Sequence, residues 1–142
     1  MDKCKSMEIL KSNKIRVTRA REAIIDIIIA LNKPFSVNEL YAIYLQKNTT
    51  EITTIYRFIV VLAEKKIIRD IGNFNNTQYY ELACVHNPLH PHFFCNVCHK
   101  IQCLKQLSTD DFIRLSGYVN NNTINEVKII MAGICEKCKN ID

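Results

Sequence analysis

Four cysteines in two C-x-x-C pairs are the residues of this sequence best suited to chemistry. The first pair is Cys95 and Cys98, and the second is Cys135 and Cys138. A C-x-x-C pair can present two thiolates on one tight turn, and four thiolates complete the tetrahedral shell of a structural Zn²⁺. The pairs therefore predict a structural zinc site that ties together the ends of a small subdomain. The alternative is a redox pair accompanied by two unrelated thiols.

A second candidate metal site begins with His90 and His92. Alternate residues of a strand point to the same side, so both imidazoles can reach one ion. Such a pair suits Zn²⁺, Fe²⁺ or Mn²⁺. A lone histidine is more often a surface or core residue, and two at this spacing beside a hinge and a cysteine are candidate ligands.

Composition limits the classes of protein that this chain can belong to. It has 142 residues, of which 48% are hydrophobic and 7 are cysteine, and its net charge is +5. Basic residues exceed acidic ones mainly in the first 83 residues, which favours a polyanion as partner for that half. No apolar run approaches the roughly 18 residues of a membrane span, and no secretory signal is evident. We therefore expect a cytoplasmic protein without membrane contact, whose cysteines bind metal rather than form disulfides.

Hydrophobic periodicity predicts four helices in the first half. Their expected ranges are 3–12, 19–31, 37–48 and 54–66. Thr18, Ser36 and Thr53 are the expected N-caps, and Glu39 completes a capping box with Ser36. Each cap fixes where its helix begins.

The pattern then changes to two short strands, 67–71 and 78–82, separated by a turn. Three helices followed by a hairpin make a winged helix, in which the last helix enters the major groove of DNA. We therefore expect residues 1–83 to form a DNA-binding domain.

The second half reads as a smaller α+β domain. Residues 84–89 contain proline and little periodicity, so we interpret them as a hinge before a domain at 90–142. Strands are expected at 92–94, 101–104 and 123–132, and Ser108 is expected to cap a helix that begins with acidic residues.

These residues resemble the ferric uptake regulator superfamily of bacterial metal-dependent repressors, along nearly the whole chain. The matching stretches are Arg16–Arg21, Ser36–Tyr41, Thr53–Arg57, Tyr80–Leu82, His90–Cys98 and the Cys135/Cys138 pair. The resemblance implies a homodimer that binds double-stranded operator DNA through winged helices. It also implies that the C-terminal domain mediates dimerisation and binds zinc.

The resemblance also implies a regulatory metal site. Asp70, Cys84, His90 and His92 match the sensory set of the zinc uptake regulators in type and spacing. A thiolate ligand moves metal preference toward zinc. The iron-sensing branch stays open, because Glu81 is close to its glutamate. Cys103 stands where a peroxide-sensing relative has a metal-binding aspartate, and it is either an extra ligand or a plain strand residue.

The residues expected to contact DNA combine basic and polar side chains. They are Lys14, Arg19, Arg21, Thr54, Tyr56 and Arg57. Arginine can pair bidentately with guanine, and tyrosine can pack on a thymine methyl group. By resemblance, Tyr56 and Arg57 are closest to the bases and Lys14 lies near a minor groove, while Arg19 and Arg21 suit phosphate contacts. The alternative for Tyr56 is a half-buried helix aromatic.

Together these features predict a repressor of metal-uptake genes that is active when zinc is bound, and not an enzyme. Iron-responsive, manganese-responsive and peroxide-sensing regulators of the same superfamily are the alternatives. A thiol oxidoreductase is a more remote one, because neither C-x-x-C pair has a thioredoxin-like βαβ context. The roles of Cys4 and His86 stay open.

Overall fold

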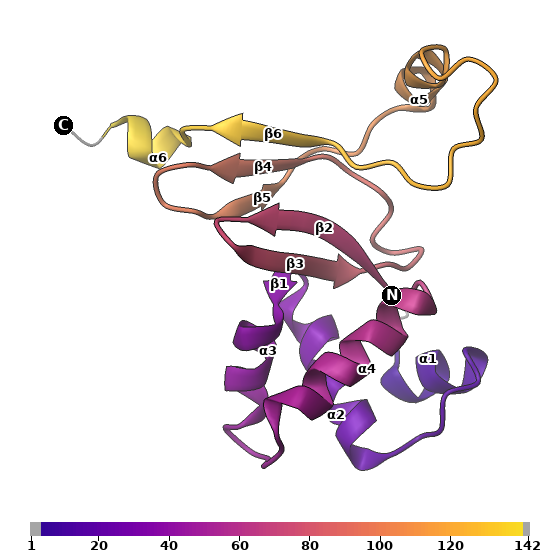
Figure 1. The fold of residues 1–142 in the computed structure, drawn as a ribbon, viewed down its shortest axis with the longest axis vertical. Helices are drawn as coiled ribbons and strands as arrows, with labels where there is room; N and C mark the ends of the chain where they lie inside the picture. The colour runs from indigo at the N-terminus through magenta and orange to yellow at the C-terminus, as the bar shows by residue number, and fades with distance from the viewer. Residues whose placement is uncertain (1–3, 141–142) are drawn as a thin grey trace. The chain divides into compact units, whose positions relative to one another are not determined.

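The computed structural model describes residues 4–140 and divides into two compact units, Met1–Asn87 and Pro88–Asp142 (Figure 1). The division lies within the segment that the sequence suggests is a hinge. Each unit has its own sheet.

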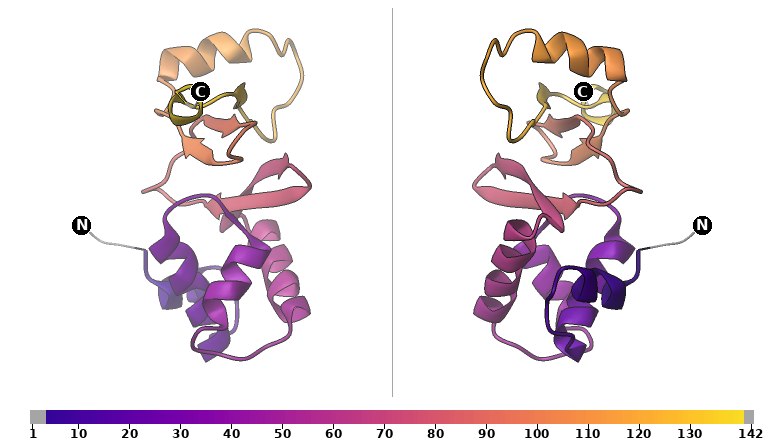
Figure 2. Two further views of the ribbon diagram at one scale, coloured as in Figure 1. Left: turned by 90° about the vertical axis from the view of Figure 1, so that its left-hand side faces the viewer. Right: turned by 90° about the vertical axis from the view of Figure 1, so that its right-hand side faces the viewer.

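The first unit holds four helices and three strands in its described part. They are α1 (Ser6–Ser12), α2 (Arg19–Leu31), β1 (Phe35–Ser36), α3 (Val37–Tyr44), α4 (Ile52–Glu64), β2 (Ile68–Phe74) and β3 (Thr77–Leu82). Figure 2 shows these helices gathered together, with the β2–β3 hairpin at one end of them. Helices followed by a hairpin form the predicted winged helix.

Two of the three caps predicted in the first unit are confirmed. The Thr18 hydroxyl accepts a hydrogen bond from the Arg21 amide at 3.2 Å, and the Ser36 hydroxyl accepts one from the Glu39 amide at 3.1 Å. These bonds satisfy amides at the first turns of α2 and α3. The Glu39 carboxylate forms an ion pair with Lys33 at 3.0 Å. This ion pair takes the place of the bond from the Ser36 amide to Glu39 that the predicted capping box requires.

The prediction that Thr53 caps the third long helix is wrong. Helix α4 begins two residues earlier than predicted, at Ile52, and its N-cap Glu51 makes no side-chain cap bond. Ile52 continues the apolar periodicity of the helix backward, and burial outweighs the capping preference of a threonine. Thr53 therefore lies inside the first turn.

The core of the first unit is built where the helices meet. Fully buried side chains from three helices pack together, with Ile25 from α2, Leu40 from α3, and Ile55 and Leu62 from α4. Phe35 of β1 joins them. Burying each such side chain contributes about 1.5–3 kcal/mol, so the core fixes the direction of α4.

The sheet of the first unit has the order β1-β3-β2 and is antiparallel. Two residues are too short for a periodic signal, so β1 was not predicted. A bulge between Asp70 and Gly72 lets β2 carry an extra residue, Ile71, which is buried. Gly72 adopts φ +134°, a backbone conformation that side chains disfavour, which explains a glycine there.

The second unit contains three strands and two helices in its described part. They are β4 (His92–Cys95), β5 (Ile101–Cys103), α5 (Thr109–Ser116), β6 (Ile130–Gly133) and α6 (Glu136–Lys139). The strand order is β5-β4-β6, with β4 antiparallel to β5 and parallel to β6. Ser108 caps α5, as predicted, and the structure adds a reciprocal capping box with Asp111.

The predicted strand at 123–132 forms only at its end. Residues 123–129 take no strand pairing in the described chain, and β6 covers Ile130–Gly133. Helix α5 buries none of its residues, although Phe112 and Leu115 line a groove with residues 123–129. Both observations concern one region, which Figure 1 shows as α5 and the long loop after it.

The second unit has little apolar core among its described residues. Its buried hydrophobic side chains are Phe94, Cys95 and Cys135, whereas the large core cluster lies in the first unit. A unit this small needs a staple or a partner to stay folded. None of the described helices is long and apolar enough to cross a membrane.

Candidate metal centres and nucleic-acid interface

The four cysteines of the two C-x-x-C pairs come together in the second unit. Their sulfur atoms all lie within 4.8 Å of one another, and the Cys98 and Cys135 sulfurs are 3.8 Å apart. Four sulfurs at about 2.3 Å from one Zn²⁺ would be about 3.8 Å from each other in a tetrahedron. The donor set and its spacing therefore fit Zn²⁺.

Chain folding explains how the pairs meet. Strands β4 and β6 run parallel, with Cys95 opposite Gly133, so both deliver a cysteine pair to the same end of the sheet. Cys95 ends β4, and Cys135 is the N-cap of α6. Each pair then turns tightly, with the Cys138 amide bonded to the Cys135 carbonyl at 3.0 Å.

The Cys95 sulfur is prepared to bind a cation as a thiolate. It accepts hydrogen bonds from the amides of Cys98 at 3.5 Å, Cys135 at 3.4 Å and Val97 at 3.4 Å. These amides lower the pKa of Cys95 to about 6, the Cys98 amide most strongly. The pKa of Cys138 is raised to about 12, mainly by the hydrogen bond between Cys138 and Cys135. A metal ion would offset the negative charge that thiolates concentrate in this cluster.

His90 and His92 also lie together in the second unit. Both are buried, and their ring centroids are 4.5 Å apart. The prediction that both histidines lie on one strand holds only for His92, because β4 begins at that residue. The two rings are nevertheless in contact. The Pro88 carbonyl lies 2.8 Å from the His90 Nδ1, which orients that ring.

Cys103 lies close to these two histidines. The sequence alone left open whether Cys103 is a ligand or a plain strand residue. Its sulfur and one ring nitrogen of each histidine lie within 4.8 Å of one another. The β4–β5 pairing sets Cys103 directly opposite His92. Two imidazoles and a thiol suit a transition metal ion, and the thiol favours zinc. Strand pairing was the missing signal, because sequence alone does not give the register.

Asp70 and Cys84, the other two predicted regulatory ligands, lie in the first unit with different neighbours. The Asp70 carboxylate accepts a hydrogen bond from Gln78 Nε2 at 2.6 Å. Cys84 lies with Cys4 and His86, and their ligand atoms are within 4.8 Å of one another. Within the second unit the structure thus brings His90 and His92 together, and within the first unit it places Asp70 beside Gln78 and Cys84 beside Cys4 and His86.

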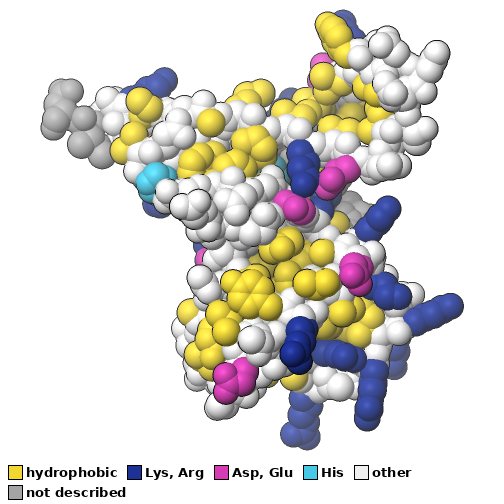
Figure 3. Space-filling view, in the orientation of Figure 1, with side chains coloured by type: hydrophobic (Ala, Val, Ile, Leu, Met, Phe, Trp, Pro, Cys, Tyr) yellow, Lys and Arg dark blue, Asp and Glu magenta, His cyan; other side chains and the backbone are white. Residues whose placement is uncertain are grey.

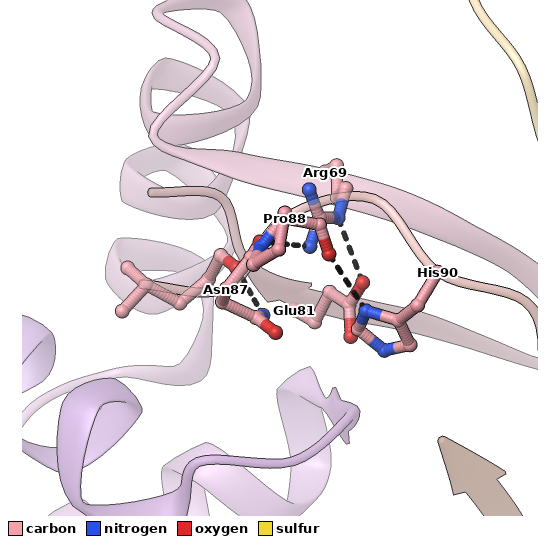
Figure 4. A network of polar contacts seen from close by, with 6 residues as sticks. Arg69, Glu81, Asn87, Pro88 and His90 are labelled. Atoms are coloured by element: carbon pink, nitrogen blue, oxygen red, sulfur yellow. Dashed lines mark hydrogen bonds and ion pairs between the residues drawn. The ribbon is translucent and has the colours of Figure 1, made fainter. Parts of the chain in front are cut away.

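Glu81 is almost fully buried in the first unit and is held by Arg69 (Figure 4). The Arg69 Nε lies 2.7 Å from the Glu81 carboxylate, and its Nη2 donates to the Asn87 carbonyl at 2.6 Å. Asn87 in turn donates to the Leu82 carbonyl at 2.6 Å. This network fixes the end of the first unit to β2 and β3.

The predicted DNA contacts lie on the first unit, and most are exposed. Lys14, Arg19, Thr54 and Arg57 are exposed, and Figure 3 shows Lys and Arg side chains projecting from the helical part of the chain. Arg21 is partly buried, because its guanidinium lies 5.6 Å from the Phe58 ring centroid.

A shallow surface pocket brings several of these residues together. Its lining includes Arg16 and Arg21 from beside and within α2, and Thr54 and Arg57 from α4. The Arg21 Nη1 donates to the Arg16 carbonyl at 2.9 Å, so this arginine is held in place. Three arginines around one hollow favour phosphate, which bidentate guanidinium groups recognise well.

Tyr56 lies beside a different hollow. Its side chain is 48% exposed, so about half of the ring is available for contact. A second pocket is lined by Tyr56 and by residues of the hairpin and of α3, including Gln78 and Asn38. Helix α4 and the hairpin therefore present polar groups side by side.

Comparison with known proteins assigns the family. Residues 12–132 match the family described as "FUR: Ferric uptake regulator family", which is most of the chain. The chain belongs to the ferric uptake regulator family. The resemblance stated from the sequence is thus confirmed at the level of the family.

Members of the ferric uptake regulator family with different named roles resemble this chain. The peroxide-responsive repressor PerR of Staphylococcus saprophyticus is 24% identical over 135 residues, covering 94% of this chain and 89% of that protein. The ferric uptake regulator of Helicobacter pylori superposes with a TM-score of 0.75 at 19% identity, covering 96% of this chain and 90% of that one. A zinc uptake regulator complexed with zinc and DNA superposes with a TM-score of 0.63 at 18% identity, covering 94% and 89%.

The family match assigns the family and these likenesses support the fold, but neither selects a branch. The structural matches are all below 25% identity, so they speak for the fold alone. The names cover iron, zinc and peroxide, and the metal-binding side chains of this chain must decide among them.

Proposed function

We propose that this protein is a zinc-responsive transcriptional repressor that binds operator DNA as a homodimer. Membership of the ferric uptake regulator family supports a metal-responsive DNA-binding regulator. The grouping of Cys103 with His90 and His92 supports zinc, because a thiolate beside two imidazoles favours zinc over iron or manganese.

The four-cysteine cluster is proposed to hold a structural zinc ion. Cys95, Cys98, Cys135 and Cys138 supply four sulfur ligands, which leaves no position for water or substrate. Such a site contributes folding free energy directly to a unit that has little apolar core. The ion would thus act as a staple and not as the sensor.

The regulatory ion is proposed to bind His90 and His92, with Cys103 as a further donor. Asp70 and Cys84, which the resemblance adds to this set, stay predictions. A metal ion regulates only if it binds the DNA-competent conformation more tightly, and DNA must then raise metal affinity by the same factor. The proposed outcome is repression of metal-uptake genes when zinc is plentiful.

DNA binding is assigned to the first unit. Helix α4 with Thr54, Tyr56 and Arg57 is proposed to enter the major groove. Lys14, Arg19 and Arg21 are proposed to contact the backbone or an adjacent minor groove. The three-arginine hollow supports the assignment of phosphate to Arg21.

The test is binding to an operator-like duplex, titrated separately with Zn²⁺, Fe²⁺ and Mn²⁺ after each preparation is analysed for metal. One retained zinc per chain, with a further zinc that switches DNA binding on, is the expected result. Cys103→Ser should weaken that switch while the retained zinc stays. Switching by iron or manganese with zinc inactive would contradict the zinc assignment.

A peroxide-sensing regulator is the second candidate, favoured by the likeness to PerR of S. saprophyticus. It predicts that Fe²⁺ activates DNA binding and that hydrogen peroxide then abolishes it. A zinc sensor would keep its DNA affinity under the same brief peroxide treatment. DNA affinity measured before and after hydrogen peroxide is added therefore distinguishes the two functions.

A further inference from the structure

The first unit carries a third group of metal-binding side chains, two of which, Cys4 and His86, have no part in the proposed function. Cys4, Cys84 and His86 each offer a ligand atom within 4.8 Å of the others. The Cys4 sulfur lies 3.4 Å from His86 Nδ1. Cys4 precedes α1, whereas Cys84 and His86 follow β3, so segments from opposite ends of the unit meet here.

The turn that carries Cys84 and His86 is held in place. The Asn87 amide donates to the Cys84 carbonyl at 2.9 Å, and the Asn87 side chain donates to the Leu82 carbonyl at 2.6 Å. Arg69 clamps the Asn87 carbonyl from β2 at 2.6 Å (Figure 4). Two of the three ligands therefore lie on a fixed turn, which lowers the entropy cost of binding an ion.

The chemistry of the group selects soft cations. Two thiols and an imidazole are donors that suit Zn²⁺ and Cu(I), while Mg²⁺ and Ca²⁺ prefer oxygen. A cation bound between the two sulfur atoms would stabilise thiolates that otherwise repel each other.

We propose that Cys4, Cys84 and His86 bind one thiophilic metal ion, Zn²⁺ or Cu(I), which ties the segment before α1 to the turn after β3. The three residues leave room for one further ligand in a tetrahedral shell. Binding closes a loop that contains every helix of the first unit and stabilises that unit by mass action. The proposal stands whichever metal regulates DNA binding.

This assignment gives Cys84 a different partner from the one that its family resemblance suggests. An ion held by Cys84 with Cys4 and His86 is separate from one held by His90 and His92. The two assignments make different predictions for Cys4, which takes part only in the first. Cys4 is therefore the most informative position.

The experiment counts bound metal in the full-length reduced protein. Zn²⁺ is titrated against a chromophoric chelator, and Cu(I) is titrated without oxygen in a parallel arm. Cys4→Ser, Cys84→Ser and His86→Asn should each bind one equivalent fewer than the wild type in the same arm. His99→Asn is the matched control, because His99 is exposed and belongs to none of the groups of three or more metal-binding side chains among residues 4–140.

A second readout locates the ion. Hydrogen exchange in α1 and in the turn at 84–87 should slow when the metal is added to the wild type, and not when it is added to Cys4→Ser. This readout separates the site from the four-cysteine cluster, which lies in the other unit.

Three results would overturn the proposal. The first is that Cys4→Ser and His86→Asn keep the wild-type stoichiometry with both metals. The second is that His99→Asn loses as much metal as they do. The third is that native alkylation finds Cys4 and Cys84 joined in a disulfide. If only Cys84→Ser loses metal and also loses metal-dependent DNA affinity, Cys84 belongs to the regulatory set instead.

Discussion

The Cys95 sulfur shows how a single atom can be prepared for its role by the backbone around it. Three amides point at it, one of them from the second cysteine pair, so the second pair helps to ionise the first. Ligation requires the thiolate, and a pKa of about 6 supplies it at neutral pH. The other three sulfurs then join an anion that already exists.

We expect Cys95→Ser to lose one zinc per chain and to unfold the second unit, because that unit has little else to stabilise it. Zinc content by elemental analysis and hydrogen exchange in β4 and β6 measure the two effects. Cys103→Ser is the matched control and should keep this zinc. A Cys95→Ser protein with full zinc content and protected strands would remove the cluster from its structural role.

Arg57 and Lys14 separate two kinds of DNA contact. Arg57→Ala should weaken operator binding by about 1–3 kcal/mol, roughly 5- to 150-fold, and relax the base preference. Lys14→Ala should weaken binding to all duplexes alike and lower the salt dependence by about one counterion. Fluorescence anisotropy at several salt concentrations measures both. Arg114→Ala, on α5 of the other unit, should change neither.

Arg69 stabilises the first unit through the buried carboxylate of Glu81. Arg69 is 20% exposed and Glu81 2%, so removing the arginine leaves a charge away from water. Arg69→Met should therefore lower the free energy of unfolding by about 3 kcal/mol, and Arg69→Met with Glu81→Met should recover much of the loss. Urea denaturation of metal-free protein measures this. Equal stability of the single variant and the wild type would contradict it.

At the scale of elements, capping sets the boundaries of the helix that carries two of the predicted DNA contacts. Thr18→Ala should destabilise the first unit by about 1 kcal/mol, because it leaves the Arg21 amide without its side-chain partner. Thr123→Ala, in the loop of the second unit, should have no such effect. Thermal unfolding followed by circular dichroism compares the two variants.

The elements that sequence predicted best are those fixed by local physics. Helix α2 begins after Thr18 and ends at Leu31, as its cap and apolar spacing require. Helix α4 begins earlier than predicted because burial of its apolar side outweighs the capping preference of Thr53. Strand β1 was not predicted because it depends on pairing with the distant strand β3. The same distinction holds for the sites. The C-x-x-C spacing is local and predicts its cluster, whereas Cys103 depends on the register between β4 and β5.

At the scale of the whole molecule, the second unit leaves large apolar side chains exposed to solvent. Ile113 is 64% exposed and Tyr118 85% exposed, near a groove between α5 and residues 123–129. Open strand edges and an uncovered helix face mark an interaction surface. A second copy of the chain is the partner that the proposed homodimer requires, and pairing with that copy would extend the strand predicted at 123–132.

We expect Leu115→Asp to convert the proposed dimer to a monomer, because a charge placed in that groove opposes burial against a second copy. Val60→Asp, at an exposed position of α4, is the matched control and should stay dimeric. Sedimentation analysis measures the masses. Two variants of equal mass would move the interface elsewhere.

The parallel pairing of β4 with β6 has a consequence for how the protein is made. The first unit forms a compact body of its own, so we expect it to fold before the rest of the chain has been synthesised. The cysteine cluster must wait, because β4 needs β6 beside it and the last ligand is residue 138. A nascent chain stopped before that residue would carry a folded first unit and an incomplete set of cysteine ligands. If the cluster binds zinc as proposed, zinc capture would be a late step in synthesis, and a chain that fails it would expose an unfolded second unit to proteases.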